Sequence, residues 1–370
     1  MRLSDLIHAC EVLAPESLAE EWDSVGLQTG SPGVVVSRVL LALDATAETL
    51  AEARAAGAQC LLTHHPLIFR PLRSLREDRP EGRLLAALVR DGIALYVAHT
   101  NLDLARPGTS DALADALGIE KTRALVPAER PVGERRFKLA VFVPTTDAEG
   151  VRAAMGDAGA GAIGNYSHCS FSAPGTGSFR PLAGAHPAIG TVGAQERVAE
   201  EKVEALVPAR LLPRVVAAML AAHPYEEVAY DIYPLAPPPS GAGLGRVGSL
   251  ADPCSLAELV GRARERLSPA NVAVMGDPAR RIERVAVCGG SGGDLVDAAA
   301  SAGADALLTG DVKHHQALRA RDLGLAVVDA SHYATERPVL DLLAARLREA
   351  LPAEVEIQVS TVNTDPFRQP

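Results

Sequence analysis

The sequence predicts an α/β protein made of two related halves, with an α+β domain of a different type inserted between them. The first observation is a repeat, because residues 38–65 and 284–311 align without gaps. Both segments begin with Arg-Val, place Ala-Gly-Ala at the same offset and close an apolar run with Leu-Leu-Thr. The second observation is a change of pattern between the repeats, where residues from about Phe137 to Leu235 follow the order β-α-β-β-α-β.

Each repeat reads as a buried strand, a turn, an alanine-rich helix and a second buried strand. The helix is expected to end near Gly57 in the first repeat and near Gly303 in the second. A further strand follows a helix in each half and opens at Gly92 and Gly324. This alternation predicts parallel sheets with helices on their faces. At the N-terminus, MRLSDLIHACEVLAP predicts an amphipathic helix with Ser4 as its N-cap.

The inserted segment begins with a predicted strand at 137–145 and a helix at 147–159, and a second helix runs from about 211 to 222. Its β-α-β-β-α-β order is typical of a ferredoxin-like domain. The Pro- and Gly-rich tract 234–245 reads as the linker at its exit. We therefore expect a first core half at 1–130, the inserted domain at 131–237 and a second core half at 238–370.

Composition excludes several classes of function. The 370 residues carry a formal net charge of −10, which disfavours nucleic acids and anionic membrane surfaces as partners, since both require a basic face. The five cysteines are scattered and form no CxxC pair, so a disulfide scaffold or a thiolate zinc site is disfavoured and a reducing compartment fits. No segment reaches the roughly 18 consecutive apolar residues of a membrane span. We expect a soluble cytoplasmic protein.

Histidines and carboxylates gather where the predicted strands end. These side chains are His64, His65, His99, Asp103, His332 and Glu336. Ligands of parallel sheets collect at the carboxyl ends of strands, and the i, i+4 spacing of His332 and Glu336 would turn both side chains the same way on a helical turn. Nitrogen and oxygen donors without cysteine suit Zn, Fe, Mn, Co or Ni. The sequence therefore predicts a metal site in which Glu336 can bridge two ions.

Other candidates have alternative interpretations. His99 could bind metal or orient a ligand through a hydrogen bond, and we favour the second role. His315 lies at a predicted helix start, where it either faces the site or caps the helix. The glycine run 289–293 lacks the lysine and the spacing of a P-loop, so a tight turn is favoured over a phosphate site. The adjacent Glu226 and Glu227 would point to opposite faces of a strand, which favours packing over catalysis.

Five motifs extend along the chain: 22-WDSVGLQTG-30, 62-LTHHPLIF-69, 98-AHTNLD-103, 309-TGDVKHH-315 and 331-SHYATERP-338. Together they resemble the Nif3-like family, also called the GTP cyclohydrolase I type 2 or dinuclear metal centre hexameric proteins. The resemblance covers essentially the whole chain. One departure is Ser24, which stands where the family usually has Asn.

The resemblance implies a Nif3-like core of two α/β halves with a PII/CutA-like ferredoxin insert. It also implies a toroidal homohexamer with metal sites facing its interior, and two divalent ions per subunit. One ion would take His64 and Asp103, the other His65 and His332, with Glu336 shared. Which histidine serves which ion is not fixed by the sequence.

The activity that the resemblance implies is metal-dependent hydrolysis of a C–N bond in a purine-type nucleotide or a related ring, as in GTP ring opening. In this hypothesis His99 or His315 transfers protons as a catalytic residue. The alternative is a non-enzymatic protein that handles metal ions or regulates assembly. The residues singled out above serve both hypotheses equally.

Overall fold

The computed structural model of the protein describes residues 1–128, 135–236 and 241–368. The chain divides into two compact units, which we call the core (Met1–Val132 and Pro239–Pro370) and the insert (Gly133–Pro238). The expected domain boundaries at 130/131 and 237/238 lie outside the described residues, as does part of the expected exit linker. Within the described ranges, no helix is long and apolar enough to cross a membrane.

The first sheet of the core has the strand order β1-β4-β3-β2-β15. Its strands are β1 (Gly26–Thr29), β2 (Arg38–Ala42), β3 (Cys60–Thr63), β4 (Ala94–Val97) and β15 (Glu356–Val359). The three strands predicted in the first half are β2, β3 and β4, and they pair in parallel. The antiparallel strand β1 completes one edge.

The second sheet of the core has the strand order β11-β14-β13-β12-β10-β5. Its strands are β5 (Ile119–Pro127), β10 (Gly243–Ser255), β11 (Ala273–Met275), β12 (Arg281–Ser291), β13 (Ala306–Gly310) and β14 (Ala326–Asp329). The predicted strands of the second repeat, β12, β13 and β14, are again parallel. The halves exchange edge strands, since the C-terminal β15 pairs with β2 and the N-terminal β5 pairs with β10.

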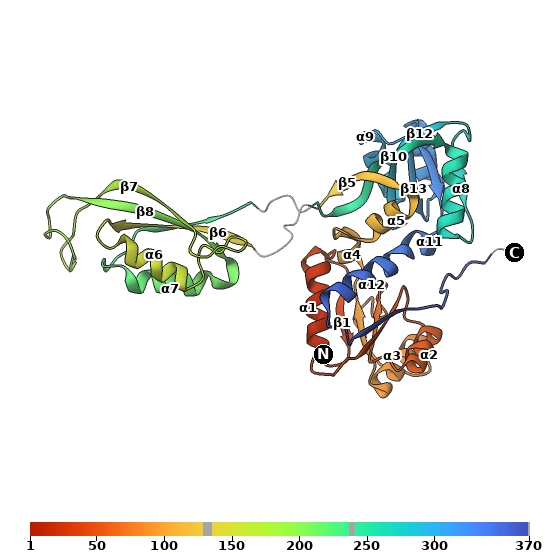
Figure 1. Cartoon of the computed structure of the whole chain (residues 1–370), viewed down its shortest axis with the longest axis horizontal. Coiled ribbons are helices and arrows are strands. Elements are labelled where there is room, and N and C mark those ends of the chain that lie inside the picture. Colours follow the sequence, from red (N-terminus) through yellow and green to blue (C-terminus); the bar gives the residue numbers. More distant parts are fainter. Residues whose placement is uncertain (129–134, 237–240, 369–370) are drawn as a thin grey trace. The chain divides into compact units, whose positions relative to one another are not determined.

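Helices cover both faces of both sheets in the core (Figure 1). The first sheet lies between α1 (Leu3–Leu13) with α12 (Pro338–Ala350) and α2 (Ala47–Ala56) with α3 (Pro80–Asp91). The second lies between α5 (Thr109–Leu117) with α8 (Leu256–Leu267) and α9 (Val296–Ser301) with α10 (His314–Asp322). Burial on both faces explains why these strands are continuously apolar. The predicted N-terminal helix is α1, but its N-cap is Arg2 and Ser4 lies inside it.

The insert has the predicted ferredoxin-like topology. Its elements are β6 (Arg136–Pro144), α6 (Ala148–Asp157), β7 (Ser170–Phe179), β8 (Glu196–Pro208), α7 (Leu212–Ala222) and β9 (Tyr230–Pro234). They form an antiparallel sheet of order β7-β8-β6-β9. The two helices lie side by side and pack on one face of this sheet (Figure 1).

A buried arginine joins the two halves of the core. Arg246 on β10 has no exposed surface. Its Nε and Nη2 donate to the two carboxylate oxygens of Asp111 at 2.8 and 2.7 Å. Its remaining N–H groups donate at 2.7–2.8 Å to the carbonyl oxygens of Ala105, Gly243 and Gly245. Every guanidinium N–H therefore has an acceptor, which is the condition for burying this charge.

We expect Asp111→Ala to lower the free energy of unfolding by about 3–5 kcal/mol, because it leaves a buried guanidinium without its counter-ion. Urea unfolding of the metal-free protein measures the change. The control is Asp297→Ala, which removes the exposed partner of Arg319 and should have little effect. Equal stabilities of the two variants would show that the buried pair does not hold the halves together.

Candidate metal centre

The predicted metal ligands lie at the carboxyl ends of parallel strands in both sheets. The first half supplies them from the ends of β3 and β4, and the second half from the end of β14. They are His64 and His65 after β3, Asp103 in the short helix α4 (Thr100–Leu104), and His332 and Glu336 at the two ends of the short helix α11 (His332–Glu336).

Glu336 lies at the centre of these side chains and is itself buried. Its Oε1 lies 3.0 Å from His332 Nε2 and 3.6 Å from His64 Nε2. Its Oε2 lies 3.1 Å from His65 Nε2. His64 Nε2 is also 3.6 Å from Asp103 Oδ1. The structure thus brings all five predicted ligands into one group, which we call the histidine–carboxylate cluster.

Each histidine of the site uses its Nδ1 for a hydrogen bond outside the cluster. The partners, at 2.7–2.9 Å, are the Ala98 carbonyl for His64, Asp44 for His65, Asp311 for His332 and Asp23 for His99. A carbonyl oxygen only accepts, so Nδ1 of His64 carries a proton, and its Nε2 faces the cluster and can bind a metal ion once the ring is neutral. Histidines oriented from behind by carboxylates or carbonyls are typical of metal sites.

The atoms of the cluster fit a divalent metal ion. Three of its buried atoms have no hydrogen-bond partner among the described residues, namely His64 Nε2, Asp103 Oδ1 and Glu336 Oε2. The 3.1 Å contact between His65 and Glu336 Oε2 is close but lacks hydrogen-bond geometry. Unpaired buried polar groups destabilise a protein by about 1–3 kcal/mol each, and an ion bound by these atoms would remove that penalty. The nitrogen and oxygen donors suit Zn, Fe, Mn, Co or Ni.

The donor atoms of two overlapping groups of side chains lie close enough together to hold ions. One group contains His65, His332 and Glu336, and the other contains His64, His65 and His99, with all donor atoms in a group within 4.8 Å of one another. The ring of His99 lies 5.3 Å from that of His64 and 5.6 Å from that of His65, measured between centroids. His99 is therefore part of the site, within reach of both adjacent histidines.

Charges within the cluster shift the pKa values of its members. Burial opposes the charged form of Glu336, but the charge of His64 and the hydrogen bond from His332 outweigh it and hold the pKa of Glu336 well below its usual range. Burial also opposes protonation of His65, yet Asp44 and Glu336 raise its pKa to about 10. The same balance, with Glu336 as the main partner, raises the pKa of His332 to about 9. Without metal, the cluster holds protons on its imidazoles at neutral pH.

The glycine run 289–293, which begins in the last residues of β12 (Arg281–Ser291), forms part of the wall around Glu336. Gly290 has a left-handed backbone with φ of +68°, and a Cβ there would lie 2.3 Å from Glu336 Oε1. Its N–H donates to Thr335 Oγ1 and its carbonyl accepts from Thr309 Oγ1, both at 3.0 Å. The run was not among our predicted site residues. Its role is to let the backbone approach the central carboxylate.

Two carboxylates of the site were also not predicted, and one predicted histidine lies apart. Asp44 follows the end of β2, and Asp23 lies in the first of the five motifs. Asp23 additionally accepts the backbone N–H of Thr100 at 3.1 Å. His315 is exposed at the start of α10, where its ring lies 5.4 Å from that of His314, and no contact of the described residues joins it to the cluster.

An exposed aromatic pair borders the site. Trp22 is 59% exposed and Phe69 is 45% exposed, and their rings lie 5.8 Å apart. The Trp22 ring also meets His99 edge-on at 6.2 Å. The Gln28 side-chain amide joins the segment that carries Trp22 to the segment that carries Phe69. It donates to the carbonyls of Ser24 and Ile68, both at 3.0 Å, and accepts the Ile68 N–H. The pair presents a fixed surface on which a planar ring can stack.

Comparison with known proteins gives consistent matches over the whole chain. The family model Duf34/NIF3 (NGG1p interacting factor 3) matches residues 1–366. A Mycobacterium tuberculosis relative named GTP cyclohydrolase 1 type 2 homolog is 45% identical over 99% of this chain and 97% of its own. The Bacillus subtilis protein of the same name is 41% identical over 98% and 97%. A crystal structure of a Bacillus cereus protein related to NIF3 has a TM-score of 0.79 at 41% identity, over 99% of this chain and 98% of its own.

We expect Gly290→Ala to reduce metal binding without unfolding the core, because the new methyl group displaces Glu336. Gly303→Ala is a matched control, since Gly303 has φ of +73° and open space around the position of its Cβ. Both variants carry similar backbone strain, about 1 kcal/mol. Metal content after reconstitution and dialysis should fall in Gly290→Ala alone. An equal content in the two variants would show that Glu336 does not need this space.

We also expect metal binding to release protons. The pKa values of His65 and His332 in the metal-free protein are raised to about 10 and about 9, so both rings are protonated at pH 7, whereas a metal ion binds the neutral ring. Binding at pH 7 should release at least two protons, and affinity should rise with pH up to about 10, where His65 loses its proton. Calorimetry in buffers of different ionisation enthalpy measures the release, and an enthalpy independent of the buffer would contradict it.

Proposed function

Because this chain belongs to the Duf34/NIF3 family, we propose that it is a dinuclear metal-dependent hydrolase that acts on a nucleotide or a related ring. The observation that carries the proposal is the position of Glu336. Its Oε1 faces His64 at 3.6 Å and its Oε2 faces His65 at 3.1 Å, and these two histidines are assigned to different ions below. A carboxylate in this position can bridge two ions. The name shared by the relatives, GTP cyclohydrolase 1 type 2 homolog, suggests the same class of reaction.

In this proposal His64 and Asp103 hold one ion, His65 and His332 hold the other, and Glu336 contacts both. Divalent ions bound there would supply a Lewis acid that activates water and polarises an oxygen atom of the substrate. The protein contributes ligands whose rings are already oriented, so little reorganisation accompanies binding.

His99 is the residue best placed to transfer protons. Asp23 accepts a hydrogen bond from its Nδ1 at 2.9 Å, which leaves Nε2 as the proton acceptor. Burial and the nearby charge of His64 lower the pKa of His99, so the ring is neutral at neutral pH and can accept a proton. His315 is exposed at the start of α10 and lies apart from the cluster, so we favour His99 for proton transfer.

Trp22 and Phe69 support a substrate that carries a planar ring. Stacking of a base on an aromatic side chain contributes roughly 1–3 kcal/mol, and this pair lies beside His99. The two rings would hold the substrate beside the histidine–carboxylate cluster, where the hydrolysis would take place.

We further propose that the protein is a toroidal homohexamer in the cytoplasm. The family resemblance supports the assembly, and light scattering of the purified protein tests it. The five free thiols, of which Cys10, Cys60 and Cys288 are buried, support a reducing compartment.

The decisive experiment compares metal-loaded protein, chelated protein and Glu336→Ala on GTP and a panel of nucleotides. We expect turnover in the loaded protein, and its loss after chelation and in the variant, because both remove the bridged ions. Loaded protein should contain about two ions per chain, since Glu336 offers one oxygen to each. Asp44→Asn, which weakens the orientation of His65, should reduce activity or metal affinity by about 10–100-fold.

His8→Ala is the control, because His8 is an exposed histidine on α1 and its loss should leave turnover unchanged. Tight binding and transfer of metal without turnover of any nucleotide would reject the hydrolase and identify a metal-handling protein. Loss of activity in Trp22→Ala through a raised KM alone would support the stacking surface.

A further inference from the structure

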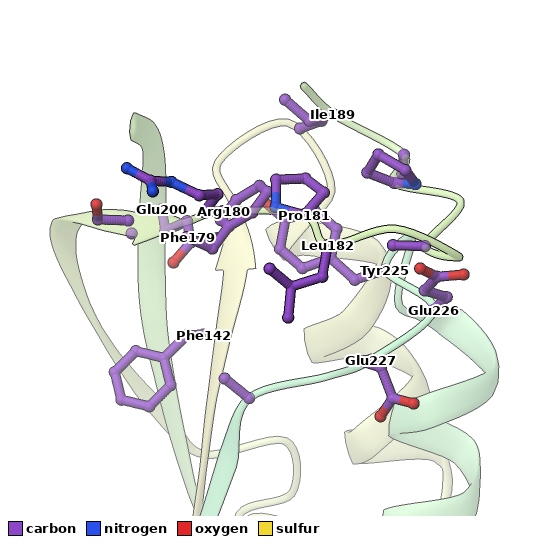
Figure 2. A pocket seen from close by; sticks show the side chains of 16 residues that line it. Phe142, Phe179, Arg180, Pro181, Leu182, Ile189, Glu200, Tyr225, Glu226 and Glu227 are labelled. Carbon is purple, nitrogen blue, oxygen red and sulfur yellow. The ribbon is translucent and has the colours of Figure 1, made fainter. Parts of the chain in front are cut away.

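The insert contains a pocket that the proposed function does not use (Figure 2). Its volume is about 500 Å³, within the range of roughly 300–1,000 Å³ that is usual for small-molecule sites. The apolar part of its lining includes Phe142 on β6, Phe179 at the end of β7, and Leu182 and Ile189 from the connection between β7 and β8. Leu182 is 72% exposed, so the mouth of the pocket presents apolar surface to solvent.

A buried carboxylate lines the pocket. Glu200 on β8 is only 8% exposed, and its Oε1 accepts a hydrogen bond from the Tyr225 hydroxyl at 3.0 Å. Gly177 on β7 leaves room for it, because a Cβ there would lie 2.1 Å from Glu200 Oε2. Burial and the neighbouring carboxylate raise the pKa of Tyr225, so the hydroxyl remains a donor to Glu200 at neutral pH.

The aromatic wall is fixed before any ligand binds. The Tyr225 ring lies edge-on to Phe179 at 5.7 Å and to His223 at 5.1 Å. His223 is buried, accepts the Tyr225 N–H on Nδ1 at 3.1 Å and donates from Nε2 to the Phe142 carbonyl at 3.0 Å. This network holds Tyr225 against β6, so a ligand meets rings that are already oriented.

The charges of the pocket favour a cation. Glu200, Glu226 and Glu227 line it, whereas Arg180 is the one basic side chain among the described lining residues. Glu226 also links two segments of the lining, because its Oε1 accepts the backbone N–H of His186 at 2.8 Å and so joins the β7–β8 connection to the loop after α7. Aromatic faces add to the attraction for a positive charge.

We propose that this pocket binds a small organic cation with an aromatic or apolar body, such as an arylalkylamine. The ammonium group would pair with Glu200. The apolar body would lie with the Phe179–Tyr225 ring pair on one side and the side chain of Leu182 on the other. The site belongs to the insert and its ligand is independent of the metal centre. The ferredoxin-like unit would thus be a ligand-binding domain carried by a metal-binding core.

Tryptamine is a suitable probe, with indole-3-propionate as the same ring bearing the opposite charge. We expect calorimetry on the full-length, zinc-loaded protein to show saturable binding of tryptamine and at least tenfold weaker binding of the acid. Glu200→Gln keeps the size of the side chain and should weaken tryptamine binding by about tenfold, because a charge-assisted contact becomes neutral. Glu149→Gln changes an exposed carboxylate on α6 that does not line the pocket and should leave the affinity unchanged.

Circular dichroism establishes that each variant is folded. Tryptamine affinity that is unchanged in folded Glu200→Gln would place the amine elsewhere and overturn the proposal, as would equal binding of the acid. Leu182→Asp tests whether a second copy covers the pocket. A smaller particle mass for this variant, together with absence of tryptamine binding to the wild-type protein, would identify the pocket as an interface between copies and not as a ligand site.

Discussion

The buried guanidinium of Arg246 is the constraint on which the geometry of the core depends. It comes from the second half, yet two of its acceptors, Ala105 and Asp111, lie in the first. Ala105 is two residues beyond the predicted ligand Asp103 in the chain. Asp111 lies in the first turn of α5 beside Ser110, whose hydroxyl accepts the Gly289 N–H at 3.3 Å. A fully buried charge allows few alternative positions for its partners. One interaction therefore fixes both Asp103 and the glycine run that makes room for Glu336.

The candidate metal centre is built from side chains of both halves, and the two copies of the repeat supply different groups to it. After β3 the first half continues with His64 and His65, which point donor atoms into the cluster. At the end of β13 the equivalent positions are Gly310, its last residue, and Asp311, and Asp311 instead accepts a hydrogen bond from His332 Nδ1. One copy thus supplies ligands where the other supplies the group that orients a ligand.

The sequence was sufficient to predict elements that depend on local periodicity. It was not sufficient to predict strand pairings and site residues that depend on contacts between distant segments. Apolar runs and glycine helix ends were sufficient for the parallel strands and for the ferredoxin-like order of the insert. The exchange of β5 and β15 leaves no periodic signal, because an edge strand of either sheet has the same pattern. Asp44 and Gly290 were missed for a similar reason, since a single carboxylate or glycine acquires its role only from His65 or Glu336, which the fold places beside it.

The charge balance of the cluster explains how these ligands can be buried before any metal arrives. Glu336 would be a strongly destabilising charge in the core if it stood alone. Its low pKa and the raised pKa values of His65 and His332 show that neighbouring imidazolium groups compensate it. A metal ion bound by the same donor atoms would bring positive charge and replace this compensation as the protons leave. Because Arg246 and the packed sheets hold the core, we expect it to keep one arrangement with and without the ion.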